Sequence, residues 1–320
     1  MSNVEAAPVE TPCGHEQVPD GPTHELMPGR EVVLGGPRGM AVSRTLPHKE
    51  RRMVGAWCFV DQYGPADHDM RVAPHPHTGL QTVSWLVAGE ILHRDSVGSV
   101  ALIRPGQLNL MTAGHGIAHS EESPADRSGP LHGVQLWVAL PEHARAVAPA
   151  FAHHADLPVL TRPGATVTVL MGELDGAESP ATAYTPIVGA EAALAADATL
   201  TLPLRPDFEY AALVLDGAAH VDGVPLTPGT LLYLGRERTT LDLTTLATTA
   251  RVLLLGGEPF EEEIVMWWNF VGRSHDDIAA AREQWTAADA RFGEVHGYDG
   301  APLPAPVLPN AQLKPRGRRR

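Results

Sequence analysis

Short apolar runs separated by glycine and proline occupy most of the chain between residues 30 and 257. Within the runs, apolar and polar positions often alternate, as where Val134 and Leu136 alternate with Gln135 and Trp137. A period of two predicts β-strands with two distinct faces. LVAGE followed by RPGQLNLM in the first half is echoed by LVLDG followed by PLTPGTLLYL in the second. This echo indicates a duplicated β-barrel unit.

The pattern changes to a helical period near the C-terminal end. Ser274 and Asp277 have the spacing of a capping box, and Ile278, Ala281 and Trp285 recur on one helical face. We therefore expect a short helix that packs against the barrels. The expected fold class is all-β, with two tandem barrels and a short C-terminal helix.

Shifts in composition divide the chain into five segments. We expect a flexible leader over 1–25, a first barrel over 26–145, a linker over 146–165, a second barrel with the helix over 166–295, and a Pro-rich and basic tail over 296–320. The linker is rich in alanine and has proline near both ends. His153 and His154 within it are interpreted as exposed residues, since neighbours on a strand point to opposite faces.

The charge of the chain is strongly acidic. Lys and Arg number 24 against 38 Asp and Glu, which gives a formal net charge of −14. Such a balance argues against nucleic-acid binding by the main domains. The exception is the basic end of the chain, which contains Lys314, Arg316, Arg318, Arg319 and Arg320. We interpret it as a solvated tail, and the alternative is a targeting or polyanion-binding patch.

The sequence indicates a soluble, cytoplasmic protein. Its apolar runs are all shorter than the roughly 20 residues that cross a bilayer, and the first residues lack the pattern of a secretory signal. The two cysteines, Cys13 and Cys58, are too few for a disulfide framework. We interpret Cys58 as a small buried apolar residue.

Two pairs of polar side chains stand out between residues 75 and 121. His75 and His77 form an HxH pair, and His119 and Glu121 form an HxE pair one strand-turn-strand later. Residues two apart on a strand project to the same side, so each pair can direct two ligands to one point. Three imidazoles and one carboxylate suit one divalent transition metal, namely iron, copper, nickel, manganese or zinc.

Two further histidines lie close to these pairs in the sequence. A lone histidine is usually a buried residue satisfied by a backbone carbonyl, but four candidate ligands at this spacing make that interpretation much weaker here. His115 is interpreted as lining the pocket rather than as a fifth ligand. His93, in the run ILHRDS, is expected to point outside the barrel.

At these residues the chain resembles the pirin family of the cupin superfamily. The matching stretches are HPHTGLQTVSWLVAGEILHRDS, PGQLNLMTAGHGIAHSE and VQLWVALP, with family-like flanks in VGAWCFVDQYGP and LLLGGEPFEEEIVMWWNFV. The resemblance implies two stacked, jelly-roll-like cupin barrels with one metal, held in the first barrel by His75, His77, His119 and Glu121. The second barrel lacks an HxH pair at the equivalent stretch, so it is expected to be degenerate and without metal.

The sequence departs from the family pattern at two positions. Gln81 stands where pirins commonly have glutamate, and His115 stands between two glycines where many relatives have Arg, Ser or Ala. The residues expected to line the pocket around the metal are Gln81, Met111, His115, Gln135 and Trp137.

The resemblance implies two competing functions. Pirins resemble quercetinases, so the first is a dioxygenase that uses Fe(II) and O2 on flavonols such as quercetin or on another small phenolic or enol substrate. Glu121 would then be both ligand and catalytic base. The second is a non-catalytic regulator that binds a transcription factor or a metabolic enzyme in a metal- and redox-dependent way. A metal-bearing relic with neither role is a third hypothesis.

Overall fold

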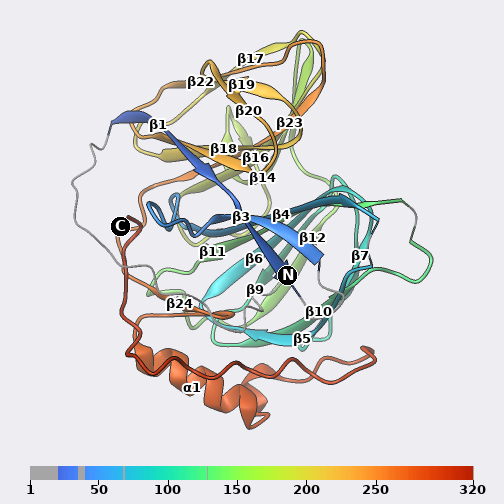
Figure 1. Ribbon diagram of the computed structural model, residues 1–320, viewed down its shortest axis with the longest axis vertical. Coiled ribbons are helices and arrows are strands. Elements are labelled where there is room, and N and C mark those ends of the chain that lie inside the picture. Colours follow the sequence, from blue (N-terminus) through green and yellow to red (C-terminus); the bar gives the residue numbers. More distant parts are fainter. Residues whose placement is uncertain (1–20, 35–39, 68, 128, 320) are drawn as a thin grey trace.

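The computed structural model describes residues 21–34, 40–67, 69–127 and 129–319. Almost all regular structure in these ranges is β-strand, arranged as two barrel-like halves (Figure 1). The expected all-β fold with two tandem barrels and a short C-terminal helix is confirmed. Within the described ranges, no helix is long and apolar enough to cross a membrane.

The first half is a sandwich of two antiparallel sheets. The larger sheet has seven strands in the order β12-β9-β6-β11-β4-β3-β2. Its strands are β2 (Arg30–Leu34), β3 (Met40–Leu46), β4 (Trp57–Ala66), β6 (Leu80–Ala88), β9 (Leu108–Thr112), β11 (Leu131–Ala139) and β12 (Ala150–His154). The smaller sheet has the order β5-β10-β7-β8, formed by β5 (Arg71–His77), β7 (Ile91–Asp95), β8 (Val100–Ile103) and β10 (Ile117–Glu122).

The second half repeats this plan. Its larger sheet runs β1-β21-β18-β23-β16-β14-β13, and β15 is paired to β14. These strands are β1 (Pro22–Pro28), β13 (Val159–Arg162), β14 (Ala165–Leu174), β15 (Ala177–Glu178), β16 (Ile187–Leu194), β18 (Glu209–Gly217), β21 (Thr230–Gly235) and β23 (Ala250–Gly257). The smaller sheet, β17-β22-β19-β20, comprises β17 (Thr199–Pro203), β19 (Ala219–Val221), β20 (Val224–Leu226) and β22 (Thr240–Thr244).

The two larger sheets pack against each other through one face of each. Trp85 on β6 donates from its indole nitrogen to Glu191 of the second half, and Gln62 on β4 donates to the carbonyl oxygen of Val214, 3.2 Å away. One apolar core cluster joins residues of both halves, including Val83 and Leu253. The opposite face of the first half's larger sheet therefore looks into the barrel interior.

A C-terminal helix covers the first half (Figure 1). Helix α1 (His275–Thr286) begins with the expected capping box, in which Ser274 accepts from the Asp277 amide. It buries Ile278 and Ala281 against β24 (Val265–Trp267) and β25 (Phe270–Gly272), and the short 3-10 helix η2 (Ala290–Phe292) follows. The expectation of a packing helix is thus confirmed.

Two expectations about exposed segments differ from the structure. The segment 146–165 was expected to be a linker, yet β12 pairs with β9 of the first half and β13 pairs with β14 of the second. The basic tail was expected to be solvated, and this was wrong for Arg318. Arg318 is half-buried and forms an ion pair of 2.8 Å with the buried Glu209. The leader expected over 1–25 lies outside the described residues as far as residue 20, and β1 occupies its last part.

Candidate metal centre

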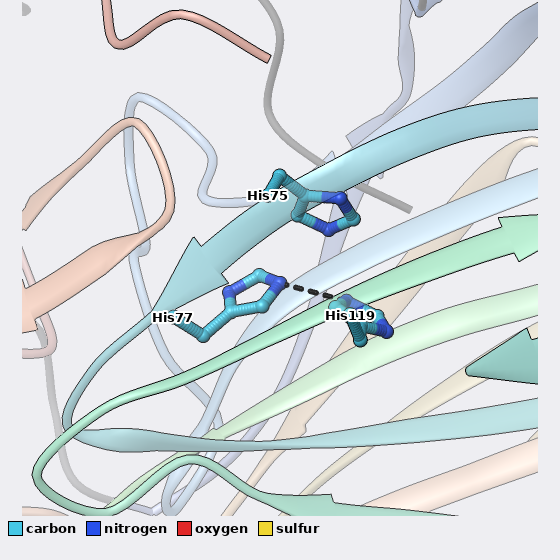
Figure 2. Close-up of side chains that lie close together, drawn as sticks. All are labelled: His75, His77 and His119. Carbon is cyan, nitrogen blue, oxygen red and sulfur yellow. Dashed lines mark hydrogen bonds between the residues drawn. The ribbon is translucent and has the colours of Figure 1, made fainter. Parts of the chain in front are cut away.

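The two ligand pairs predicted from the sequence lie on neighbouring strands of the smaller sheet. His75 and His77 are on β5, and His119 and Glu121 are on β10. His119 lies directly opposite His75, and the register shifts between His119 and Glu121. Figure 2 shows the three imidazoles turned toward one another from these two strands. Antiparallel pairing thus brings together side chains more than 40 positions apart in the sequence.

Backbone carbonyls orient two of the imidazoles. His75 Nδ1 lies 2.9 Å from the Ala73 carbonyl oxygen, and His77 Nδ1 lies 3.2 Å from the Asn269 carbonyl oxygen. Because a carbonyl can only accept, each Nδ1 carries the proton and each Nε2 keeps its lone pair. His75 Nε2 is buried without a hydrogen-bond partner in the described part of the protein. These two rings therefore offer Nε2 as a ligand atom.

The third imidazole completes this arrangement. His119 Nε2 lies 3.1 Å from His77 Nε2 (Figure 2). Two lone pairs facing each other at this distance repel unless a proton or a cation lies between them. The candidate ligand atoms of His75, His77 and His119 all lie within 4.8 Å of one another. This donor set fits a divalent transition metal.

Burial keeps these imidazoles neutral. It lowers the pKa of His75 to about 3 and lowers the pKa of His77 and His119 well below the ordinary value, where the nearby His75 adds to the effect. Metal ions bind the neutral form of imidazole, so at pH 7 no proton has to be displaced from these three rings. Both groups of candidate ligands in the described part of the chain lie in the first half.

His93 was expected to point outside the barrel, and the structure shows the opposite. Its side chain is buried, and its Nδ1 lies 3.4 Å from His119 Nδ1. The other ring nitrogen, Nε2, lies 3.1 Å from the carboxylate of Asp95, and the ring stacks on Phe151 with centroids 4.4 Å apart. His93 also lies directly opposite Glu121 in the sheet and forms a second candidate ligand group with His119 and Glu121.

These contacts indicate which ring nitrogen of His119 and of His93 carries a proton. If His119 offers Nε2 to a metal, its Nδ1 carries a proton and donates to His93 Nδ1. His93 then carries its own proton on Nε2 and donates it to Asp95. Such outer hydrogen bonds orient metal-binding histidines and raise their basicity. The sequence did hold a signal for this pair, because the HxD spacing of His93 and Asp95 has the same period of two as the ligand pairs.

Three of the residues expected to line the pocket lie on the sheet face that looks toward the imidazoles. Trp137 lies against His77, with ring centroids 5.2 Å apart, and Met111 lies opposite Thr82, which in turn is opposite Trp137. Gln135 is on the same face of β11 as Trp137, two residues away, and is fully buried. These three residues share the face that looks toward the imidazoles.

Gln81 and His115 lie elsewhere. Gln81 is on the other face of β6, and its amide donates to Thr112 at 2.9 Å and to the carbonyl of Thr182 in the second half at 3.1 Å. The expected pocket position of Gln81 is therefore corrected to the contact between the halves. His115 is exposed, and its Nδ1 lies 3.2 Å from the Val147 carbonyl oxygen.

Comparison with known proteins agrees with this description. The family model for pirin matches residues 39–138, and that for the pirin C-terminal cupin domain matches residues 189–293. A Pseudomonas aeruginosa protein provisionally named quercetin 2,3-dioxygenase is 51% identical over 88% of this chain and 89% of its own length. A pirin-like protein from Caulobacter vibrioides is 38% identical over 82% of this chain and 94% of its own.

A solved structure extends the likeness to the fold. The crystal structure of quercetin 2,3-dioxygenase from Acinetobacter baumannii has a TM-score of 0.86 and 45% identity, covering 91% of this chain and 97% of that one. Fold and site together define a two-domain cupin protein with a histidine-rich centre in its first domain. The chain belongs to the pirin family.

Proposed function

We propose that this protein is a metal-dependent dioxygenase that acts on flavonols such as quercetin or on a related small phenolic or enol substrate. The observation that carries the proposal is the convergence of three buried imidazoles, each with a candidate ligand atom within 4.8 Å of the others. The relatives that carry the name quercetin 2,3-dioxygenase support the choice of reaction.

In this proposal His75, His77 and His119 hold one divalent metal, Fe(II) in our first choice, with Glu121 as the fourth ligand. A metal held there would supply Lewis acidity toward a substrate oxygen. Three imidazoles and one carboxylate leave positions open on a metal that accepts five or six ligands. The HxH and HxE pairs fix the ligand atoms on strands rather than on loops, which preserves their geometry.

Glu121 is the proposed catalytic base. It is fully buried and lies on β10 directly opposite His93. A carboxylate oxygen of Glu121 takes the proton from the enol hydroxyl of the flavonol, and the resulting enolate is the species that reacts with O2. Both atoms of O2 then bond to the two ring carbons that flank the carbon bearing this oxygen. The two C–C bonds of that carbon break and it leaves as carbon monoxide, while the proton on Glu121 returns to the ring-opened product.

The test is turnover by protein loaded in turn with Fe(II), Ni, Mn, Cu or Zn. We expect oxygen uptake, loss of the quercetin absorbance and carbon monoxide release with at least one metal. Glu121→Gln should lower kcat by about 100-fold or more, as expected for loss of a general base, while the three histidines retain metal. Absence of turnover at full occupancy with every metal would refute the oxygenase proposal. Pull-downs with reduced and oxidised metal would then test the regulator hypothesis.

A further inference from the structure

A row of polar side chains crosses the interior face of the first half's larger sheet. Each member lies directly opposite the next on neighbouring strands, from β3 through β4, β11 and β6 to β9. The members, in that order, are Arg44, Asp61, Gln135, Ser84 and Asn109. Directly opposite residues on antiparallel strands share a face. The row is therefore one continuous strip, which we call the polar row.

The polar row faces the same space as the imidazoles. Gln135 lies two residues from Trp137, which touches His77. Asn109 lies two residues from Met111, and Met111 is opposite Phe151, which stacks on His93. Alternation places each pair on one face.

Residues at both ends of the polar row already make hydrogen bonds to neighbouring side chains. Arg44 forms a bidentate ion pair with Asp61, with nitrogen–oxygen distances of 2.7 and 2.8 Å. At the other end, His153 Nδ1 lies 2.8 Å from Asn109 Oδ1. In the middle, Ser84 donates its hydroxyl to Gln135 Oε1 at 2.9 Å. The acceptor oxygens of both amides are thus occupied.

The nitrogen atoms of these amides have no such partners. Gln135 Nε2 and Asn109 Nδ2 are buried and have no hydrogen-bond partner within the described residues, and the same holds for Trp137 Nε1 and the Tyr63 hydroxyl on this face. Burial and the charge of Glu121 raise the pKa of Tyr63 well above its ordinary value, so its hydroxyl keeps its proton. All four groups can donate. A buried donor left without an acceptor costs about 1–3 kcal/mol, so their alignment beside the imidazoles calls for a ligand.

We propose that these four groups bind acceptor oxygens of the substrate other than the oxygen that meets the imidazoles. The inference rests on the proposed function for the place of that oxygen. Gln135, Asn109, Trp137 and Tyr63 are then specificity-determining residues.

The charge of the polar row argues against phosphate and dicarboxylate substrates. The cation in the row, Arg44, is neutralised by Asp61 in bidentate geometry. Phosphate and dicarboxylate ligands are usually bound by an arginine or lysine that makes such contacts with the ligand itself. The donors in the middle of the row are uncharged amides, an indole and a phenol. They fit neutral or singly charged oxygen-rich molecules.

The test uses zinc-loaded protein without O2, so that a bound flavonol is not converted, and calorimetric titration with two flavonols. Quercetin carries hydroxyl groups beyond the 3-hydroxy-4-carbonyl unit, and 3-hydroxyflavone has that unit alone. Gln135→Met and Asn109→Leu should each weaken quercetin binding by about tenfold, as expected for the loss of one buried hydrogen bond. Both variants should bind 3-hydroxyflavone within about twofold of wild type.

Gln62→Met is the matched control, because Gln62 is also a buried glutamine of this sheet but faces the second half. It should leave both affinities unchanged. Equal losses for the two flavonols, or no loss for either, would overturn the inference and leave the oxygenase proposal intact. Failure of wild-type protein to bind either flavonol would instead count against flavonols as substrates.

A second measurement uses wild-type protein, so it still tests the proposal if Gln135→Met or Asn109→Leu folds poorly. The side-chain amide NMR signals of Gln135 and Asn109 in wild-type protein should shift when quercetin is added to the zinc-loaded protein without O2, whereas the Gln62 signal should stay in place. Signals of Gln135 and Asn109 that stay in place at ligand saturation would overturn the inference.

Discussion

The imidazole of His93 connects the candidate ligand His119 to Asp95 through hydrogen bonds. It lies between His119 and Asp95, and Asp95 is itself held by the backbone amides of Val97 and Ser99 at 3.1 and 2.9 Å. The position of His119 Nε2 therefore depends on residues that do not themselves have to touch a metal.

His93→Ala should weaken metal binding by about 10–100-fold, the usual effect of removing an outer hydrogen-bond partner. Asp95→Asn should act in the same direction and more weakly, because the amide can still accept a hydrogen bond from His93. Competition with a chelator measures both affinities. Wild-type affinity in His93→Ala would show that His119 is oriented without this contact.

Protonation of the buried histidines makes the stability of the metal-free protein depend on pH. Unfolded histidines have a pKa near 6.5, whereas burial lowers the pKa of folded His75 to about 3 and those of His77 and His119 in the same direction. Between these values the unfolded state binds more protons, so the free energy of unfolding is highest above pH 6.5 and falls as the pH decreases toward 3.

Each of these histidines can contribute up to about 1.4 kcal/mol per pH unit within that window. Urea titrations of metal-free protein at pH 7.5 and 5.5 measure the change. A variant with His75, His77 and His119 replaced by glutamine should show a smaller loss between the two pH values. Equal losses in the two proteins would contradict the assignment.

At the residue scale, the sequence predicted which side chains pair but did not show on which side some of them lie. The HxH and HxE pairs were recognisable because ligand spacing and strand period coincide. Alternation separates the two faces of β7 but does not tell which face is inside. That choice follows from the pairing of β7 with β10, which puts His93 opposite Glu121. Gln81 was misplaced for the same reason, because β6 carries buried residues on both of its faces.

At the scale of elements, the turns before β6 and β10 decide where the ligand pairs lie. Gly79 and Gly114 have positive φ values of 68° and 52°, and the Gly79 amide donates to the Gly114 carbonyl at 2.9 Å. A Cβ at Gly114 would lie 1.9 Å from the Val147 carbonyl oxygen. Glycine is therefore required here by both conformation and space.

Gly114→Ala should lower the free energy of unfolding by about 2–4 kcal/mol, through a left-handed conformation and the steric overlap. Gly98→Ala is the matched control, because Gly98 also has a positive φ, of 96°, but a Cβ there meets nothing within 4 Å. It should cost only about 1–2 kcal/mol. Urea denaturation compares them, and equal losses would show that the contact with Val147 is unimportant.

At the scale of the whole molecule, the C-terminal tail joins the two halves. Glu209 of the second half is fully buried and accepts from the Gly55 amide of the first half at 2.7 Å, from the Tyr233 hydroxyl at 2.9 Å and from Arg318 of the tail at 2.8 Å. The carbonyl of Arg318 accepts from the Arg52 amide at 2.8 Å. The tail thus supplies the positive charge that this buried carboxylate needs.

Arg318→Met should destabilise the protein by roughly 3 kcal/mol, because it leaves a buried carboxylate without its cation. Adding Glu209→Gln should recover part of the loss, and Lys314→Met in the exposed part of the tail should have almost no effect. Thermal unfolding of the four proteins tests this. A loss that Glu209→Gln does not reduce would assign it to packing instead of charge.

The tandem β architecture could be predicted from the sequence because the period of two and the echo between halves are local signals. The tail could not, because its anchor Glu209 lies more than 100 residues away and looks like an ordinary surface carboxylate in the sequence. The same limit applies to β1, which follows the leader in the sequence but pairs with β21 of the second half.

The metal content of purified protein beside that of His119→Ala tests the central claim most directly. His153→Ala, which removes an exposed histidine of β12, serves as the control. Elemental analysis should find one divalent metal per chain in wild type and in His153→Ala, and almost none in His119→Ala. Unchanged metal content in His119→Ala would contradict the assignment of the centre.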